Sequence, residues 1–344
     1  MNISRTPDWK SGMAKNAEKT EKYSGKVLIC SGGRFESQAN AQIRESIMAG
    51  WAEVFGEENV IAANINGAAA SIQYLRPTIV FAIGSYLPES TYFGEVCREA
   101  RKVGAATVFW ATEDPYEQDA SYRITDEFDV VFSCERWGSN FYTRPNVWHL
   151  PLAACPKLHY RPINETTERT IDVLFCGVAF TNRKDIVRGL LPTLRNLNIK
   201  IVGPGWGELG VGFSDARLEK EQLVQFYQHS KIVLNLGRSL SFENKRFMIS
   251  PSTPGPRTYE AAAAGAMQIF HEDTYEIRRY YTKDEIPSFS NKRDFDRLLD
   301  VYLENGALRL ETTKKAQART MSEHTYGHRI REALDILNKG GFLP

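Results

Sequence analysis

An arginine and a glutamate stand three positions apart in the run PGPRTYEAAAAGA, residues 254–266. Pro256 suits the first position of a helix, because the N–H that it lacks would have no partner there. The alanines continue the helix, and Gly265 suits its end. Such a helix begins with free backbone N–H groups, the positive end of its dipole and Arg257, all of which attract phosphate. Glu260 could accept hydrogen bonds from both hydroxyls of a ribose.

The same residues also have a purely structural explanation. An acid in the first turn stabilises any helix dipole, so Glu260 needs no ligand to account for it. Arg257 could simply be a solvated neighbour. Residue chemistry alone therefore favours a phosphate and ribose site and helix stabilisation equally.

Short apolar runs alternate with amphipathic segments along the whole chain, which predicts βαβ units. Near-continuous apolar runs of this length are typical of parallel strands covered on both faces. We expect strands at 26–30, 60–63, 78–83, 106–110, 129–133, 147–150, 171–176, 198–202, 231–236 and 266–270. We expect helices at 37–55, 89–103, 182–195, 218–228 and 256–264, and throughout the last 50 residues.

The chain has 344 residues, which suits two domains of roughly 150 residues each. Residues 1–24 are polar and predict a disordered leader without a secretory signal. A proline-containing, aperiodic segment at 154–169 predicts a linker. We expect Rossmann-like domains at 25–165 and 166–322, and a C-terminal helix at 323–344 that crosses back to the first domain.

Composition excludes several classes of protein. The formal net charge is +1, so the chain lacks the excess of basic residues that is typical of nucleic-acid-binding proteins. A nucleic acid as the sugar acceptor stays open. No apolar run approaches the ~18 residues that a membrane span needs. The five cysteines include no C-x-x-C pair and are typical of reduced core thiols. We therefore expect a cytoplasmic globular protein.

The run PGPRTYEAAAAGAMQIF resembles the donor-binding motif of GT-B glycosyltransferases, especially the CgeB-like spore-maturation family. Further segments resemble the same family in the same order: FWATEDPY (109–116), DVVFSCERW (129–137), HLPLAACPKLHYRP (149–162), IDVLFCGVAFTNR (171–183), KIVGPGW (200–206) and EHTYGHRIREALDIL (323–337). The resemblance covers residues 26–338. It implies an α/β protein of the GT-B fold, with two Rossmann-like domains facing each other across a cleft.

The resemblance also implies the roles of the two halves. The C-terminal domain would bind a nucleotide-diphospho-sugar, with UDP-sugar preferred over GDP- or TDP-sugar. The N-terminal domain would bind an acceptor hydroxyl on a glycan, glycolipid, protein or small molecule. Two alternatives stay open: a sugar-nucleotide epimerase of the same fold, and a non-catalytic sugar-nucleotide-binding protein.

The candidate donor-binding residues gather at predicted strand ends and at the start of the predicted helix. Trp206 could stack on a base, form a wall of the cleft or pack in the core. Gly33 follows the first strand and could contact acceptor or sugar phosphate. The full set is Glu260, Arg257, Thr258, Tyr259, Arg183, Gly177, Gly203, Trp206, Asn235, Arg238 and Gly33.

Transfer to a hydroxyl needs either a base that deprotonates the acceptor or, with retention, help from the donor phosphate. For the first route, Glu113 and Asp114 end a predicted strand where catalytic groups gather in open α/β sheets. Asp114 could instead cap the turn before Pro115. His149 and His271 are lesser candidates for the base.

Other residues carry weaker signals. Lys245 and Arg246 could contact phosphate or acceptor, but a solvated loop is the favoured interpretation. His324 and His328 are interpreted as packing or capping residues, and we expect a metal-independent reaction. Many retaining relatives carry a second acid eight positions before the ribose ligand, where this chain has Ser252.

Overall fold

The computed structural model describes residues 25–31, 38–87, 93–210, 212–239 and 243–343. The predicted leader at 1–24 and the predicted site residue Gly33 lie outside these residues. The chain divides into two compact units. The first consists of Met1–Pro151, Phe242–Ile249 and Arg329–Pro344, and the second of Leu152–Ser241 and Ser250–His328, as far as these ranges are described.

The first unit contains a six-stranded, fully parallel sheet in the order β2-β1-β3-β4-β5-β6. Its strands are β1 (Val27–Ser31), β2 (Val60–Asn64), β3 (Ile79–Gly84), β4 (Ala106–Ala111), β5 (Val130–Ser133) and β6 (Val147–His149). All residues of β1, β3, β4 and β5 are buried, which explains their continuous apolar sequences.

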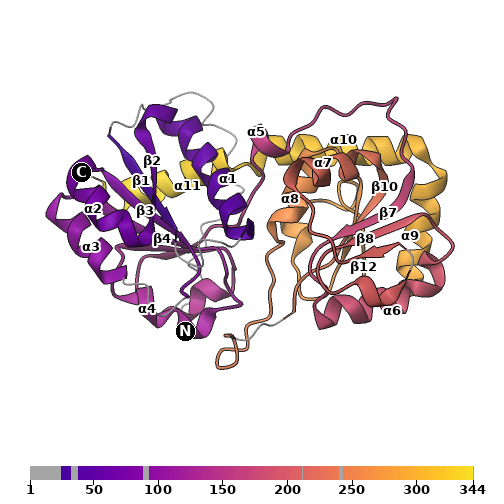
Figure 1. Ribbon diagram of the computed structural model, residues 1–344, viewed down its shortest axis with the longest axis horizontal. Coiled ribbons are helices and arrows are strands. Elements are labelled where there is room, and N and C mark those ends of the chain that lie inside the picture. Colours follow the sequence, from indigo (N-terminus) through magenta and orange to yellow (C-terminus); the bar gives the residue numbers. More distant parts are fainter. Residues whose placement is uncertain (1–24, 32–37, 88–92, 211, 240–242, 344) are drawn as a thin grey trace. The chain divides into compact units, whose positions relative to one another are not determined.

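Helices cover both faces of this sheet (Figure 1). One face packs against α2 (Ile65–Leu75) and α3 (Phe93–Lys102). On the other face, Trp51 of α1 (Gln38–Phe55) meets Phe81 of β3 edge-on, with 5.1 Å between ring centroids. The short α4 (Tyr122–Thr125) follows β4, and α11 (Tyr326–Lys339) joins this unit from Arg329 onward.

The second unit contains another parallel six-stranded sheet, in the order β12-β11-β10-β7-β8-β9. Its strands are β7 (Ile171–Cys176), β8 (Ile199–Val202), β9 (Phe213–Ser214), β10 (Ser230–Asn235), β11 (Gln268–His271) and β12 (Ser288–Phe289). Numbered from β7, this is the order 3-2-1-4-5-6 of the Rossmann fold, whose strand order reverses between β7 and β10.

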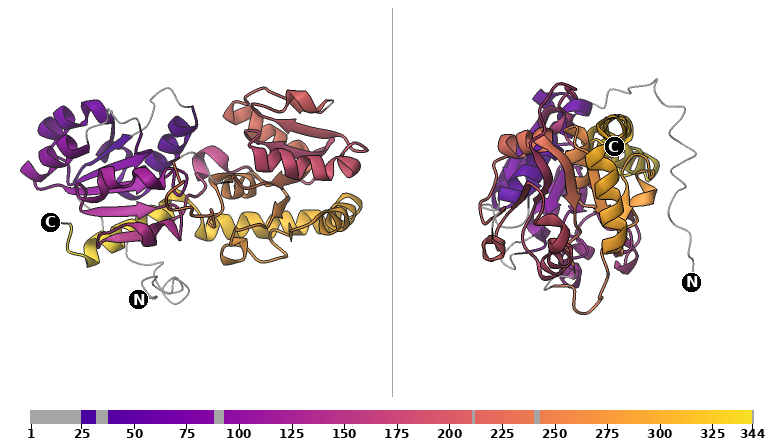
Figure 2. Two further views of the ribbon diagram at one scale, coloured as in Figure 1. Left: turned by 90° about the horizontal axis from the view of Figure 1, so that it is seen from below. Right: turned by 90° about the vertical axis from the view of Figure 1, so that its right-hand side faces the viewer.

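Two layers of helices bury the second sheet (Figures 1 and 2). Alternate residues of the strands pack against α6 (Thr181–Leu194) and α9 (Lys292–Glu304) on one face. The opposite face packs against α7 (Lys220–His229) and α8 (Pro256–Ala263). The helix α10 (Gly306–Glu323) packs against α8.

The predicted linker contains more structure than its sequence suggests. The short helix α5 (Pro156–His159) lies within it, and His159 is buried. Residues 152–165 also belong to the second unit. No described helix is long and apolar enough to cross a membrane.

Candidate active site

The carboxyl ends of β7 and β10 lie side by side at the point where the strand order of the second sheet reverses. In open α/β sheets this is the edge at which ligands bind. Cys176 ends β7 and Asn235 ends β10, and both are only partly buried. The residues that follow these two strands therefore form the floor of a candidate ligand site.

The beginning of α8 is tied to this edge by hydrogen bonds. The side-chain amide of Asn235 donates to the hydroxyl of Thr258 over 3.0 Å and to Oε1 of Gln268 over 3.0 Å. Gln268 in turn donates to the backbone carbonyl of Thr258 over 2.9 Å. Thr258 and Asn235 are both predicted donor ligands, and in the structure their polar groups fix the beginning of the helix.

Arg257 and Glu260 project from the first turns of α8, which begins at Pro256 with Gly255 as its N-cap. Nη1 of Arg257 lies 3.4 Å from the hydroxyl of Tyr227. Burial lowers the pKa of Arg257, but Tyr227, Cys176 and Glu260 outweigh burial and raise that pKa above its usual range. Arg257 therefore stays charged, and the neighbouring Glu260 side chain is 20% exposed.

Arg183 joins the loops that follow β7 and β10. Its Nε donates to the carbonyls of Leu236 and Gly237 over 3.2 Å each, and its Nη1 donates to Val178 over 3.0 Å. A Cβ at Gly177 would lie 3.0 Å from the same Nη1. These bonds make Arg183 a brace between two loops of the site.

The loop after β8 is built for close backbone contact. Gly203 has φ +142°, and a Cβ there would lie 2.3 Å from the carbonyl oxygen of Gly177. Trp206 is fully buried and its indole N–H donates to the same oxygen over 2.7 Å. Of the three interpretations of Trp206, this geometry favours packing in the core.

Tyr259 and Arg238 are also held within the second unit. Tyr259 is fully buried among Tyr280, Tyr281 and His324. The Arg238 guanidinium lies over the ring of Phe180, 4.9 Å from its centroid. Arg238 is partly exposed, unlike Tyr259, and it follows the carboxyl end of β10.

Asp114 forms a buried network in the first unit. Its carboxylate accepts hydrogen bonds from Tyr86 (2.6 Å), Ser133 (2.6 Å) and Tyr142 (2.8 Å), and the residue is 3% exposed. Burial raises the pKa of Asp114 to about 6, while the three donors oppose that rise. The carboxylate is already occupied by three donors and shielded from solvent, so this geometry does not favour Asp114 as the base.

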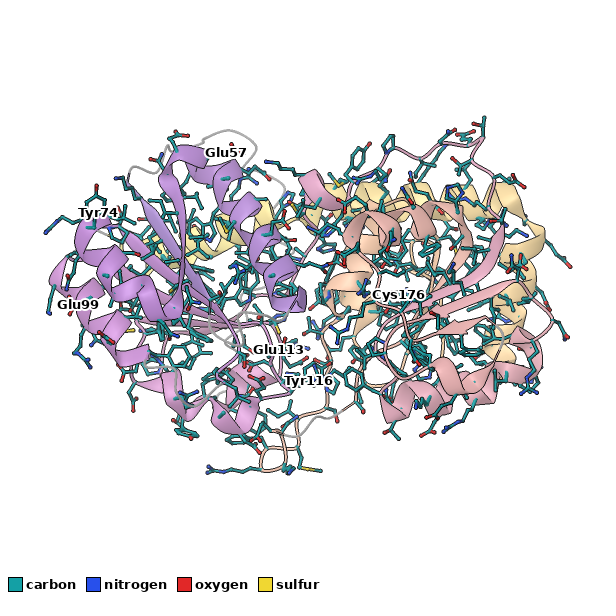
Figure 3. The ribbon with its side chains drawn as sticks, in the orientation of Figure 1. Glu57, Tyr74, Glu99, Glu113, Tyr116 and Cys176 are labelled. Carbon is teal, nitrogen blue, oxygen red and sulfur yellow. The ribbon has the colours of Figure 1, made fainter. Side chains whose placement is uncertain are left out.

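Glu113 differs from its neighbour in being only partly buried. It follows the carboxyl end of β4, and its carbonyl accepts from the N–H of Tyr116 over 2.8 Å. Both residues are labelled in Figure 3. Of the two acids predicted from the sequence, Glu113 is therefore the less enclosed one.

The predicted loop cations lie in the first unit. The backbone N–H groups of Lys245 and Arg246 donate to Oδ2 of Asp119 over 2.8 and 2.9 Å, and both residues are exposed. This geometry supports the interpretation of a solvated loop whose backbone is fixed by Asp119.

Histidines of the second unit pack or form local bonds. The ring of His324 contacts three tyrosines, Nδ1 of His328 lies 2.7 Å from the Thr325 hydroxyl, and His271 packs on Phe289. Burial lowers the pKa of His271. No group of three metal-ligating side chains occurs within the described ranges.

One Asp-x-Asp spacing occurs at residues 294–296, at the beginning of α9. Oδ2 of Asp294 accepts from the side chain of Asn291 over 2.8 Å, and Asp296 pairs with Lys292. Oδ1 of Asp296 accepts from the Thr193 hydroxyl over 2.7 Å. These bonds give both acids a capping or pairing role.

His159 and Tyr227 are the residues of the site that sequence patterns did not single out. His159 lies in the aperiodic segment that predicts a linker, and Tyr227 lies in an amphipathic helix like many others. Nε2 of His159 lies 3.8 Å from Oε1 of Glu260. The segment 149–162 that holds His159 resembles the family, but neither that resemblance nor any periodicity indicated that this histidine lies beside α8.

Residues 183–335 match a family described as Glycosyl transferase-like. The chain also resembles HepE of Anabaena solved with UDP and glucose, with a TM-score of 0.62 and 8% identity over 92% of this chain and 100% of that one. A glycosyltransferase of Rickettsia africae aligns with a TM-score of 0.62 and 10% identity, over 92% and 99% of the two chains. Sucrose-phosphate synthase of Thermosynechococcus elongatus aligns with a TM-score of 0.61 and 10% identity, over 91% and 98%.

No curated protein matches the sequence. At these identities the structural likenesses establish the GT-B fold, and the family match adds sugar transfer as the class of reaction. The chain is thus a glycosyltransferase of the GT-B fold. The segment that carries the family match begins at Arg183 and includes the whole of α8.

Proposed function

We propose that this chain transfers a sugar from a UDP-sugar to a hydroxyl-bearing acceptor without a metal ion. The observation that carries the proposal is the placement of Arg257 and Glu260 in the first turns of α8, at the ligand-binding edge between β7 and β10. The UDP and glucose bound by a protein of the same fold support uridine as the base. The ordered motifs support a CgeB-like subgroup.

The donor diphosphate lies, in this proposal, at the beginning of α8. The helix dipole, free N–H groups and the charged Arg257 neutralise it as it becomes the leaving group. Glu260 accepts from the ribose hydroxyls. Arg183 keeps the two flanking loops in place rather than contacting phosphate. In this proposal the second unit carries the donor and the first unit the acceptor.

The acceptor hydroxyl gives its proton to Glu113 as its oxygen bonds to the sugar's anomeric carbon. The bond from that carbon to the donor phosphate breaks, and UDP leaves. General-base catalysis of this kind contributes about 10²–10⁴-fold to a rate. Five free cysteines, four of them buried, support a reducing, cytoplasmic compartment.

Calorimetric titration of the full chain with UDP, GDP, TDP and ADP tests the donor site. We expect UDP to bind most tightly and Glu260→Ala to weaken UDP at least tenfold, because a ribose ligand is lost. Asp294→Ala, in the same unit but outside the site, serves as the control and is expected to bind as the wild type does. If a folded wild-type chain binds none of the four nucleotides, the proposal is wrong.

Turnover of UDP-sugars tests the base. Glu113→Gln is expected to lower kcat by about 100-fold or more while UDP affinity stays unchanged. If this variant keeps the wild-type kcat, Glu113 is not the general base.

A further inference from the structure

His159 ends the short helix α5 and is 6% exposed. Its Nδ1 accepts a hydrogen bond from the backbone N–H of Cys155 over 3.0 Å. A neutral imidazole carries one proton, so the ring proton must be on Nε2 when Nδ1 is an acceptor. The fold therefore fixes both the orientation and the tautomer of this histidine.

The Nε2–H edge faces the carboxylate of Glu260, with 3.8 Å between Nε2 and Oε1. This distance is longer than a hydrogen bond, so the ring acts through its dipole and by filling space. Charged groups around it are Glu260 and Arg257 on α8, Lys220 on α7 and Arg161. Burial lowers the pKa of His159, opposed by Glu260, so the ring is neutral at pH 7.

Glu260 has a competing partner on its own helix. Arg257 lies three positions earlier, and residues so spaced lie on the same side of a helix. An ion pair between them would occupy the two groups that the donor needs. Among the described residues, the carboxylate of Glu260 is within ion-pair distance of His159 and of no arginine.

We propose that His159 is a positioning residue for Glu260. Its fixed N–H edge attracts Oε1 and holds the carboxylate away from Arg257. That leaves Oε2 for the ribose of the nucleotide and the guanidinium for the diphosphate. This role rests on the proposed function of Glu260 and adds to the donor site a residue from outside the segment 183–335 that matches the Glycosyl transferase-like family.

A matched pair of amide variants tests the proposal. In His159→Gln the longer amide can accept from Cys155 and still present N–H groups toward Glu260. In His159→Asn the shorter amide can keep the bond to Cys155 but cannot reach Glu260. We expect UDP affinity, measured by calorimetry on the full chain, to be close to wild type in His159→Gln and about fivefold weaker in His159→Asn.

A double-mutant cycle completes the experiment. In a Glu260→Ala background, His159→Asn is expected to cause no further loss of UDP affinity, because the group that it positions is gone. If wild type binds UDP but His159→Asn binds equally well, or weakens UDP equally in both backgrounds, the role of His159 is overturned while the donor site stands. If the wild type binds no nucleotide, the donor site itself fails and the role of His159 fails with it.

Discussion

Asn235 and Thr258 are joined by a 3.0 Å hydrogen bond that connects the last residue of β10 to the first turn of α8. The same amide group bonds Gln268, which bonds the carbonyl of Thr258 in return. Three residues from two strands and a helix thus close a small ring of hydrogen bonds. Because Thr258 and Gln268 are 1% exposed, water cannot replace a lost partner.

Replacing Asn235 with alanine should loosen the beginning of α8. We expect the free energy of unfolding to fall by about 1–3 kcal/mol, because buried polar groups of Gln268 lose their partner. UDP affinity should fall as well, since Arg257 and Glu260 lie on the loosened turn. Urea unfolding and calorimetry measure the two effects. Asn196→Ala, at an exposed position, should change neither, and equal behaviour of the two variants would contradict this role.

Cys176 offers a probe of the proposed donor site, because the other four cysteines are buried. Burial raises the pKa of its thiol, partly offset by Arg257, so labelling by a maleimide should speed up as pH rises from 7 to 9. UDP should slow the labelling, since the thiol lies beside Arg257 and Glu260. Mass spectrometry of the labelled peptide measures the rate. Labelling that UDP leaves unchanged would place the nucleotide elsewhere.

Gly203 cannot accept a side chain. An added Cβ would meet the carbonyl oxygen of Gly177 at 2.3 Å, at a φ of +142°. We expect Gly203→Ala to lower the free energy of unfolding by about 2 kcal/mol or more and to weaken UDP. Gly210→Ala is the matched control, because φ is +104° there but no atom lies within 4 Å of the added Cβ. If both variants lose the same stability, close contact with Gly177 is not the cause.

Because two buried acids have raised pKa values, we expect the free energy of unfolding to fall as pH rises from acidic to neutral. Burial raises the pKa of Glu117 to about 7 and that of Asp114 to about 6. At pH values between the ordinary and the raised pKa of each acid, the folded chain binds more protons than the unfolded chain. The stability that these acids contribute below pH 4 is therefore lost as pH approaches 7. For Glu117 the loss is at most on the order of 3 kcal/mol.

Glu117→Gln tests this pH dependence, because its amide oxygen can still accept from Ser85 and from the N–H of Tyr86, as Glu117 does. Its free energy of unfolding should fall less between pH 4.5 and 7.5 than that of the wild type. Glu58→Gln, at an exposed position, should keep the wild-type difference. A Glu117→Gln chain with the full wild-type pH dependence would disprove the contribution of this acid.

The sequence predicts the fold well where local chemistry decides the structure. Pro256 begins α8 and Gly265, with φ +74°, follows its end, as their residue types indicate. The two-residue strands β9 and β12 were not predicted, because so short a segment has no period. The helix predicted over the last 50 residues is interrupted at Asn305 and at His324–Thr325.

The site was less predictable than the fold, because a sequence shows which groups are present but not what they bond. Asp114 and Glu113 look equally suitable in sequence, and only the enclosure of Asp114 by Tyr86 and Tyr142 separates them. His159 lies 101 positions from Glu260 by their numbering, and no periodicity connects residues so far apart.

The division of the chain has a practical consequence for anyone who wishes to study its halves separately. Because residues 242–249 and 329 onward return to the first unit, the polypeptide passes between the units at 151, 241, 249 and 328. Neither half is one continuous stretch of the gene. Because the first unit comes from three separate stretches of the chain, no single stop codon or protease cut divides the protein into its two units, and isolating either one requires rejoining distant segments with new connections.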